Sequence, residues 1–318
     1  MTKYTNTGNV DTRSGFGAGL LEAGRRDSNV LALTADLKGS VKMDAFAKEF
    51  PERFVQCGIA EANMVGVAAG LAITGKVPFI GSFAEFVTGR VYDQLRQEVA
   101  YGHTNVKIAS SHAGITLGED GATHQTMEDI ALMRALPGMC VIVPCDYNQT
   151  KNATIAAAAY QGPVYLRFGR PSVPNFTGAD EEFTIGKVYN LNEGSDVTIV
   201  ACGYLVWEAL LAAEELEKQG VSAEVLNVPT IKPLDSNALL ESFAKTGCGV
   251  VAEEHNMAGG LGEAVCGVLA QGTPCPVEFV NGGDRFGQSG KPAQLMEAYG
   301  LDAKSIVEKA LKVIRRKR

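Results

Sequence analysis

A glycine-rich segment carries most of the chemically active side chains of this sequence. Residues 114–125 read Gly-Ile-Thr-Leu-Gly-Glu-Asp-Gly-Ala-Thr-His-Gln, and His112 stands just before them. Two of the four histidines, His112 and His124, therefore lie within thirteen positions, with Asp120 between them. Glycine allows sharp turns and close approach to a ligand, and loops of α/β proteins often present reacting groups. The segment predicts proton transfer and recognition of substrate hydroxyl groups.

Two other interpretations of this segment compete with proton transfer. The histidines could be hydrogen-bonded loop residues, with Asp120 capping the helix that follows. Two histidines and a carboxylate could also bind a metal ion. However, the segment contains no His-x-x-x-His or His-x-Asp unit that would fix two ligands on one element. We therefore predict no metal ligands in this chain.

An acid and two aromatic rings are predicted at the ends of neighbouring strands. Glu61 follows the apolar segment 54–59 and opens a helix rich in alanine and glycine, while Phe83 and Phe86 stand where the segment 77–83 ends. Ligands of open α/β sheets gather at the carboxyl edge of the strands. An acid is also favoured at a helix amino terminus by about 0.3–1 kcal/mol, and a phenylalanine is usually a core residue. Position alone therefore leaves both interpretations open.

Two arginines could recognise an anion. Arg13 lies near the amino terminus, and Arg167 lies on the predicted strand 164–168. Each guanidinium can form a pair of charged hydrogen bonds to a phosphate or a carboxylate. The simpler interpretation of either arginine alone is a surface ion pair.

Alternating apolar runs and helical patterns predict the scaffold that positions these groups. Strands are predicted at 30–33, 54–59, 77–83, 106–109, 140–143 and 164–168, and then at 197–201, 223–228, 249–253 and 277–280. Segments of helical period separate them, which is typical of a mainly parallel sheet with helices on both faces. The pattern breaks at 171–187, so we predict an α/β protein with domains at 1–170 and 188–318 and a linker between them.

Composition narrows the classes of function. The 318 residues carry a formal net charge of −7, which gives no general attraction to nucleic acid or to an anionic membrane. The seven cysteines form no Cys-x-x-Cys pair, and no apolar run is long enough for a secretion signal or a membrane span. We expect a cytoplasmic protein with reduced thiols.

Taken together, these motifs resemble the carboxyl-terminal half of a transketolase, and the resemblance covers essentially the full length. The run Gly118-Glu119-Asp120-Gly121-Ala122-Thr123-His124-Gln125 is highly specific to that family. The resemblance implies the pyrimidine-binding fold of thiamine enzymes followed by the transketolase C-terminal domain. It also implies the pentose phosphate pathway of carbohydrate metabolism and a two-carbon ketol transfer from a ketose, usually phosphorylated, to an aldose.

The resemblance implies thiamine diphosphate as cofactor and assigns residues to its pyrimidine end. Glu61 would hydrogen-bond N1′ of the aminopyrimidine and promote the imino tautomer, which removes the proton from the thiazolium carbon. Phe86, with Phe83 beside it, would stack on the pyrimidine, and the turn at Asp36 and Leu37 would line the cofactor. Glu61, His112 and His124 are the expected catalytic residues. The expected substrate-binding residues are Arg13, Ser40, His112, Asp120, His124 and Arg167, the arginines and Ser40 holding a sugar phosphate.

A full transketolase also needs a Gly-Asp-Gly motif followed by an asparagine to bind Mg²⁺ and the diphosphate, and this sequence has no such pair. The resemblance therefore implies a separate N-terminal subunit and a heterotetramer of two copies of each chain. Three alternatives remain open: a 1-deoxy-xylulose-5-phosphate synthase, the beta subunit of a 2-oxo-acid dehydrogenase, and a non-catalytic effector-binding module. His112 argues against the first two, and the number of polar groups at the predicted site argues against the third.

Overall fold

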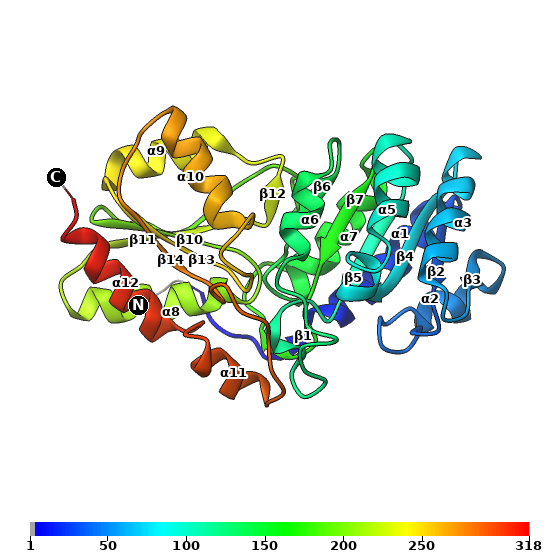
Figure 1. Cartoon of the computed structure of the whole chain (residues 1–318), viewed down its shortest axis with the longest axis horizontal. Coiled ribbons are helices and arrows are strands. Elements are labelled where there is room, and N and C mark those ends of the chain that lie inside the picture. Colours follow the sequence, from blue (N-terminus) through cyan, green and yellow to red (C-terminus); the bar gives the residue numbers. More distant parts are fainter. Residues whose placement is uncertain (1–3, 318) are drawn as a thin grey trace.

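Two parallel sheets covered by helices form the chain, and they lie side by side in Figure 1. The structure is a computed structural model that describes residues 4–317. All ten predicted strands are present, which confirms the α/β class. Within the described residues, no helix is both long enough and apolar enough to cross a membrane.

The first sheet has the strand order β12-β6-β7-β5-β4-β2-β3 and is parallel except for β12. Its strands are β2 Val30–Thr34, β3 Phe54–Gln56, β4 Val77–Phe83, β5 Lys107–Ser111, β6 Cys140–Ile142, β7 Val164–Arg167 and β12 Thr230–Lys232. The helical segments of this part are α1 Thr12–Arg26, α2 Asp44–Glu49, η1 Pro51–Arg53, α3 Glu61–Ile73, α4 Ala84–Val87, α5 Tyr92–Gln94, η2 Leu95–Tyr101, η3 Ile115–Leu117, α6 Asp129–Ala135 and α7 Tyr147–Ala159. Side chains of α1, α2 and α7 pack on one face of the sheet, and those of α3, η2 and α6 pack on the other.

The second sheet has the order β14-β13-β10-β11-β9 and is parallel except for β9. Its strands are β9 Tyr189–Asn192, β10 Val197–Ala201, β11 Ala223–Asn227, β13 Gly249–Ala252 and β14 Val277–Val280. Its helices are α8 Leu205–Lys218, α9 Ser236–Thr246, α10 Leu261–Gln271, α11 Pro292–Ala298 and α12 Ala303–Ile314. Helices α8 and α12 cover one face, and α9 and α10 cover the other.

The segment expected to be a linker, residues 171–187, is partly ordered. It contains β8 Ser172–Pro174, which pairs antiparallel with β1 Asn9–Asp11. Strand β12 also crosses from the second half of the chain to pair with β6 in the first sheet. One apolar core is continuous across both parts and includes Ile108 and Tyr165 of the first sheet with Val200 and Val251 of the second. The domain boundaries stay a prediction, but the two parts are packed together and not merely joined by a linker.

Candidate active site

Glu61 is the first residue of α3, directly beyond the carboxyl end of β3. Its side chain is only 4% exposed, and its Oε1 accepts a hydrogen bond of 2.9 Å from Nη1 of Arg90. The residue before it, Ala60, gives the helix no side-chain cap. A buried carboxylate needs a partner with charge or N–H groups, and in this structure Arg90 is that partner.

Arg90 also covers an aromatic ring. Its guanidinium carbon lies 4.0 Å from the ring centroid of Phe86, so one flat cation stacks on Phe86 while it donates a hydrogen bond to Glu61. The sequence prediction missed Arg90, although its position four residues after Phe86 is a spacing at which side chains can meet. A flat group that stacks on Phe86 and hydrogen-bonds to Glu61 would therefore take the place of the Arg90 guanidinium. An aromatic face beside a buried carboxyl group fits an aminopyrimidine ring.

The aromatic exit of β4 meets the two predicted histidines. Phe83 stacks on Phe86 with ring centroids 5.7 Å apart, and on His112 with centroids 3.9 Å apart. His124 approaches the edge of Phe86 at 5.4 Å. The structure thus brings together Glu61, the aromatic pair and both histidines, which the sequence places on different segments. Because Phe83 is stacked on His112, Phe86 offers the better face for a ligand.

His112 follows β5 with a left-handed backbone, φ 59°, and is 4% exposed. Its Nδ1 lies 2.7 Å from Oγ of Ser111, and its Nε2 lies 3.5 Å from Nη1 of Arg13, at the outer limit of a hydrogen bond. Burial lowers the pKa of His112 to about 3, with further contributions from the charges of Arg13 and Arg170. The ring is therefore neutral at pH 7. Because arginine can only donate, Nε2 is assigned as the acceptor and Nδ1–H as the donor to Ser111.

The loop after His112 turns on glycines. Gly114, Gly118 and Gly121 have φ of 81°, 96° and 74°, a region that side chains disfavour. The amide of Gly114 donates to the carbonyl of Thr126, which closes the neck of the loop. At its tip Asp120 is exposed, whereas His124 is half-buried. Oγ1 of Thr123 lies 3.0 Å from Nδ1 of His124.

Arg13 stands at the start of α1 and faces the same site. It forms an ion pair of 3.3 Å with Asp11 and donates to the carbonyl of Ser40 at 3.2 Å. Burial lowers the pKa of Arg13, which also experiences the charge of Arg170. The contact of Ser40 with Arg13 is therefore made by the Ser40 carbonyl group and not by its hydroxyl group.

The predicted turn at Asp36 and Leu37 follows the end of β2. Asp36 has φ 61°, and its amide donates to Oε1 of Gln56. The amide of Leu37 donates to Oγ1 of Thr34. Asp36 is exposed and Leu37 is half-buried, so the turn is accessible at the carboxyl edge of the sheet.

Arg167 does not join Arg13, which corrects the expected pair of arginines around one anion. The Arg167 side chain is only 5% exposed; its Nε donates to Asp129 at 2.6 Å and its Nη2 donates to the carbonyl of Glu254 at 2.9 Å. Its charge is therefore already neutralised inside the protein. Sequence reasoning selected it because it lies on a strand, but strand position gives no information on the side chain's partners.

Arg170 is the second arginine near the site, and sequence reasoning missed it. It donates to the carbonyl of Leu117 at 2.7 Å and forms a 2.9 Å ion pair with Glu119. Its side chain is 41% exposed, and its charge acts on both Arg13 and His112. The only sequence signal was its place three residues after the end of β7, beside Pro171. Arg13 and Arg170 thus place two guanidinium groups at this end of the site, each with an acid beside it.

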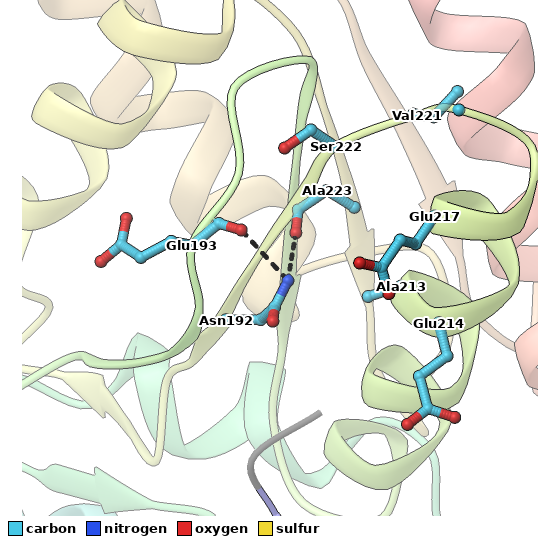
Figure 2. Close-up of a pocket in the computed structure, with 9 residues that line it drawn as sticks. Asn192, Glu193, Ala213, Glu214, Glu217, Val221, Ser222 and Ala223 are labelled. Atoms are coloured by element: carbon cyan, nitrogen blue, oxygen red, sulfur yellow. Dashed lines mark hydrogen bonds between the residues drawn. The ribbon is translucent and has the colours of Figure 1, made fainter. Parts of the chain in front are cut away.

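Two further observations limit what else the chain can do. Within residues 4–317, no group of three or more His, Cys, Asp or Glu side chains could hold a metal ion. A hollow of about 340 Å³ in the second domain, shown in Figure 2, is lined by Asn192, Glu193, Ala213, Glu214, Glu217 and the segment 220–223. It contains none of the predicted site residues, and we assign it no part in the chemistry.

The comparisons with known proteins agree with this geometry. The transketolase pyrimidine-binding domain matches residues 8–175, and the transketolase C-terminal domain matches residues 186–306. The chain is 47% identical over 298 residues to a 6-deoxy-6-sulfo-D-fructose transketolase subunit of Clostridium sp. (strain MSTE9), with 94% of this chain and 92% of the relative covered. It is 39% identical over 308 residues to one of the subunits of an apulose-4-phosphate transketolase of Phocaeicola vulgatus, with 96% and 98% covered.

A solved structure described as a split gene transketolase in an inactive beta4 tetramer superposes with a TM-score of 0.91 at 45% identity, and 98% of this chain and 100% of that chain are covered. Both family domains and these relatives span nearly all of the chain. The protein therefore belongs to the transketolase family of transferases.

Proposed function

We propose that this chain is the C-terminal subunit of a split, thiamine diphosphate-dependent transketolase that transfers a two-carbon ketol unit from a ketose phosphate to an aldose phosphate in the cytoplasm. The observation that carries the proposal is that Arg90 stacks on Phe86 and hydrogen-bonds to Glu61, which shows that one flat group can contact both residues. An aminopyrimidine would do so by stacking on Phe86 and sharing a proton between Glu61 and its ring nitrogen. When bound, the cofactor supplies the carbon nucleophile that accepts the ketol unit.

The residues of this chain would hold the pyrimidine end of that cofactor. Phe86 would offer its ring face, Glu61 would share a proton with a ring nitrogen, and Arg90 would move aside. The turn at Asp36 and Leu37 lies at the same sheet edge. Phe83 keeps His112 in place by stacking. Mg²⁺ and the diphosphate would be bound mainly by an N-terminal partner subunit.

The neighbouring groups suit a phosphorylated, hydroxyl-rich substrate. Arg13 and Arg170 provide positive charge for a phosphate, with Ser40 beside Arg13. His112 is neutral at pH 7, so its Nε2 can accept a hydrogen bond from a hydroxyl group without a charge of its own. His124 and Asp120 lie on the loop at the open side, where they can contact further hydroxyl groups and relay a proton.

A partner subunit is also part of the proposal. The relatives from Clostridium and Phocaeicola are themselves named as transketolase subunits, and they match this chain over nearly their full length. We propose a heterotetramer of two C-terminal and two N-terminal chains, which is inactive when either chain is missing.

The test is reconstitution with a neighbouring gene product that carries the Gly-Asp-Gly…Asn pattern. Ketol transfer is measured with xylulose 5-phosphate and ribose 5-phosphate, and pyruvate turnover is measured in parallel. We expect ketol transfer only with both subunits, and Glu61→Gln should lower kcat by about 10²-fold or more while the complex still assembles.

Glu208→Gln is the control, because Glu208 is also an acid in the first turn of a helix, half-buried where Glu61 is buried, but lies in the second domain. It should leave the rate within about threefold of the wild type. Pyruvate turnover without ketol transfer would reject the proposed reaction. Full activity of Glu61→Gln would reject the role of that acid.

A further inference from the structure

Residues of the second domain hydrogen-bond to the glycine-rich loop 114–125. The carboxylate of Glu254, just after β13, accepts a 2.6 Å hydrogen bond from the amide of Thr116 inside the loop. Nε2 of Gln125 donates to the carbonyl of Gln288 at 3.0 Å, and the amide of Asn256 donates to the carbonyl of Met127 at 2.6 Å. The interior of the loop and its C-terminal end are therefore tied to a part of the chain that holds none of the expected site residues.

Glu254 fits this loop closely. Its side chain is 4% exposed, and a Cβ placed on Gly114 would overlap the carboxyl group of Glu254. The same carboxyl group thus fills the space beside Gly114 and hydrogen-bonds two residues further on, at Thr116. These two positions lie between His112 and the loop's tip, so the carboxyl group limits the paths the backbone can take from that histidine.

Glu254 is itself anchored through its main chain. Its carbonyl accepts from Arg167, which is paired with Asp129 at the start of α6. Tyr165 donates to the same carboxylate of Asp129 at 2.6 Å. This buried network fixes the base of Glu254 relative to the first sheet, and it gives Arg167 a structural place beside the site.

We propose that Glu254 is a positioning residue for ketol transfer, whose carboxylate holds the amide of Thr116 and thereby fixes the loop that carries His112, Asp120 and His124. Glu254 touches neither of these histidines and acts through the loop backbone. In this proposal the second domain fixes the conformation of a glycine-rich loop whose backbone is too flexible to keep one conformation by itself. The activity part of this inference rests on the proposed function, whereas the loop part does not.

The neighbouring residue provides a matched control. Glu253 is also buried, and its carboxylate accepts from the amides of Leu261 and Gly262 at 2.7 and 2.8 Å. Both bonds lie within the second domain and neither reaches the loop. Glu253→Ala therefore removes a buried carboxylate with two backbone bonds and leaves the loop contact of Glu254 intact.

The first measurement is hydrogen exchange of the loop amides in the full chain. Glu254→Ala should make the amide of Thr116 exchange about tenfold faster or more, since a hydrogen bond to a charged acceptor is lost. Glu254→Gln keeps an acceptor oxygen and should stay within about threefold of the wild type. Glu253→Ala should leave the exchange rates of these amides unchanged, even if its melting temperature falls as much as that of Glu254→Ala.

The second measurement is kinetic and uses the reconstituted complex with xylulose 5-phosphate and ribose 5-phosphate, well below every variant's melting temperature. Glu254→Ala should lower kcat about tenfold and leave the affinity for thiamine diphosphate unchanged. Glu254→Gln should have most of the wild-type kcat, and Glu253→Ala should have a kcat within about threefold of the wild type. Wild-type loop exchange in Glu254→Ala would overturn the proposal, as would equal acceleration in Glu253→Ala. If the wild-type complex shows no ketol transfer, the proposed function fails, while the exchange data still decide whether Glu254 holds the loop.

Discussion

Replacing His112 by asparagine should change how the stability of the protein responds to acid. Burial, with the charges of Arg13 and Arg170, lowers the pKa of His112 to about 3 in the folded chain, against 6.5 for an unperturbed histidine. The folded state therefore resists protonation and the unfolded state does not. Asparagine removes the titration, tolerates the left-handed backbone at this position, and can keep a hydrogen bond to Ser111.

The size of the effect follows from these two pKa values. Below pH 6.5 the unfolded chain binds a proton at His112 and the folded chain does not. As the pH is lowered from 6.5 to about 3, the contribution of His112 to the free energy of unfolding therefore decreases. Between pH 7 and pH 5, the linkage relation gives a loss of about 2 kcal/mol for the wild type. His112→Asn should not suffer this loss. Any loss of stacking on Phe83 is nearly independent of pH and shifts the whole curve equally.

Urea unfolding at a series of pH values between 7 and 5 measures the difference. The stability of His112→Asn relative to the wild type should rise by about 2 kcal/mol as the pH falls over this range. His103→Asn is the control, because His103 also has a left-handed backbone, φ 48°, but is exposed. A parallel pH dependence for the wild type and His112→Asn would show that His112 titrates normally, and the argument for a neutral ring would fail.

Three more substitutions test other contacts of the site. Arg90→Leu removes the guanidinium group that hydrogen-bonds to Glu61 and would compete with the cofactor. Calorimetry of the reconstituted complex should therefore show about fivefold tighter binding of thiamine diphosphate. Weaker binding would mean that Arg90 contacts the cofactor. Asp129→Asn leaves the buried charge of Arg167 without its partner and should cost about 3–5 kcal/mol in urea unfolding, and a change below about 1 kcal/mol would contradict the buried pair. Arg170→Ala should raise KM for a ketose phosphate about tenfold but not KM for the unphosphorylated sugar, with equal effects on both refuting a phosphate contact.

Much of the fold follows from patterns that a single sequence contains. Eight of the ten parallel strands, all except β3 and β14, are short apolar runs buried on both faces, so their composition marks them. Helix α1 was not predicted, because its glycines dilute the apolar pattern. The structure gives the reason for these glycines: a Cβ on Gly15 or Gly19 would overlap carbonyl groups of α7. The short strands β9 and β12 were also missed, since their pairing partners lie far away in the chain.

Some residues of the candidate site could also be predicted from the sequence, and others could not. Glu61, Phe86, His112 and His124 could be identified because a family motif or a strand end marks each of them, and the structure brings them together. Arg90 and Arg170 could not be identified in this manner. A guanidinium sits at the end of a long side chain, so whether it faces the site or a buried partner depends on atoms from several segments. Arg167 is the example, since it pairs with Asp129 from 38 positions away.

The pairing of Arg90 with Glu61 gives the buried acid a partner within the same chain. A carboxylate that is 4% exposed is costly without a partner, and Arg90 satisfies it. Arg90 itself is 48% exposed, so water can receive its charge when it leaves, and the free energy of displacing it is of the order of 1 kcal/mol. In the proposed function, a ring that stacks on Phe86 and shares a proton with Glu61 would take the place of Arg90 at both residues. The prediction for Arg90→Leu follows from this competition, because that variant has no guanidinium group to displace.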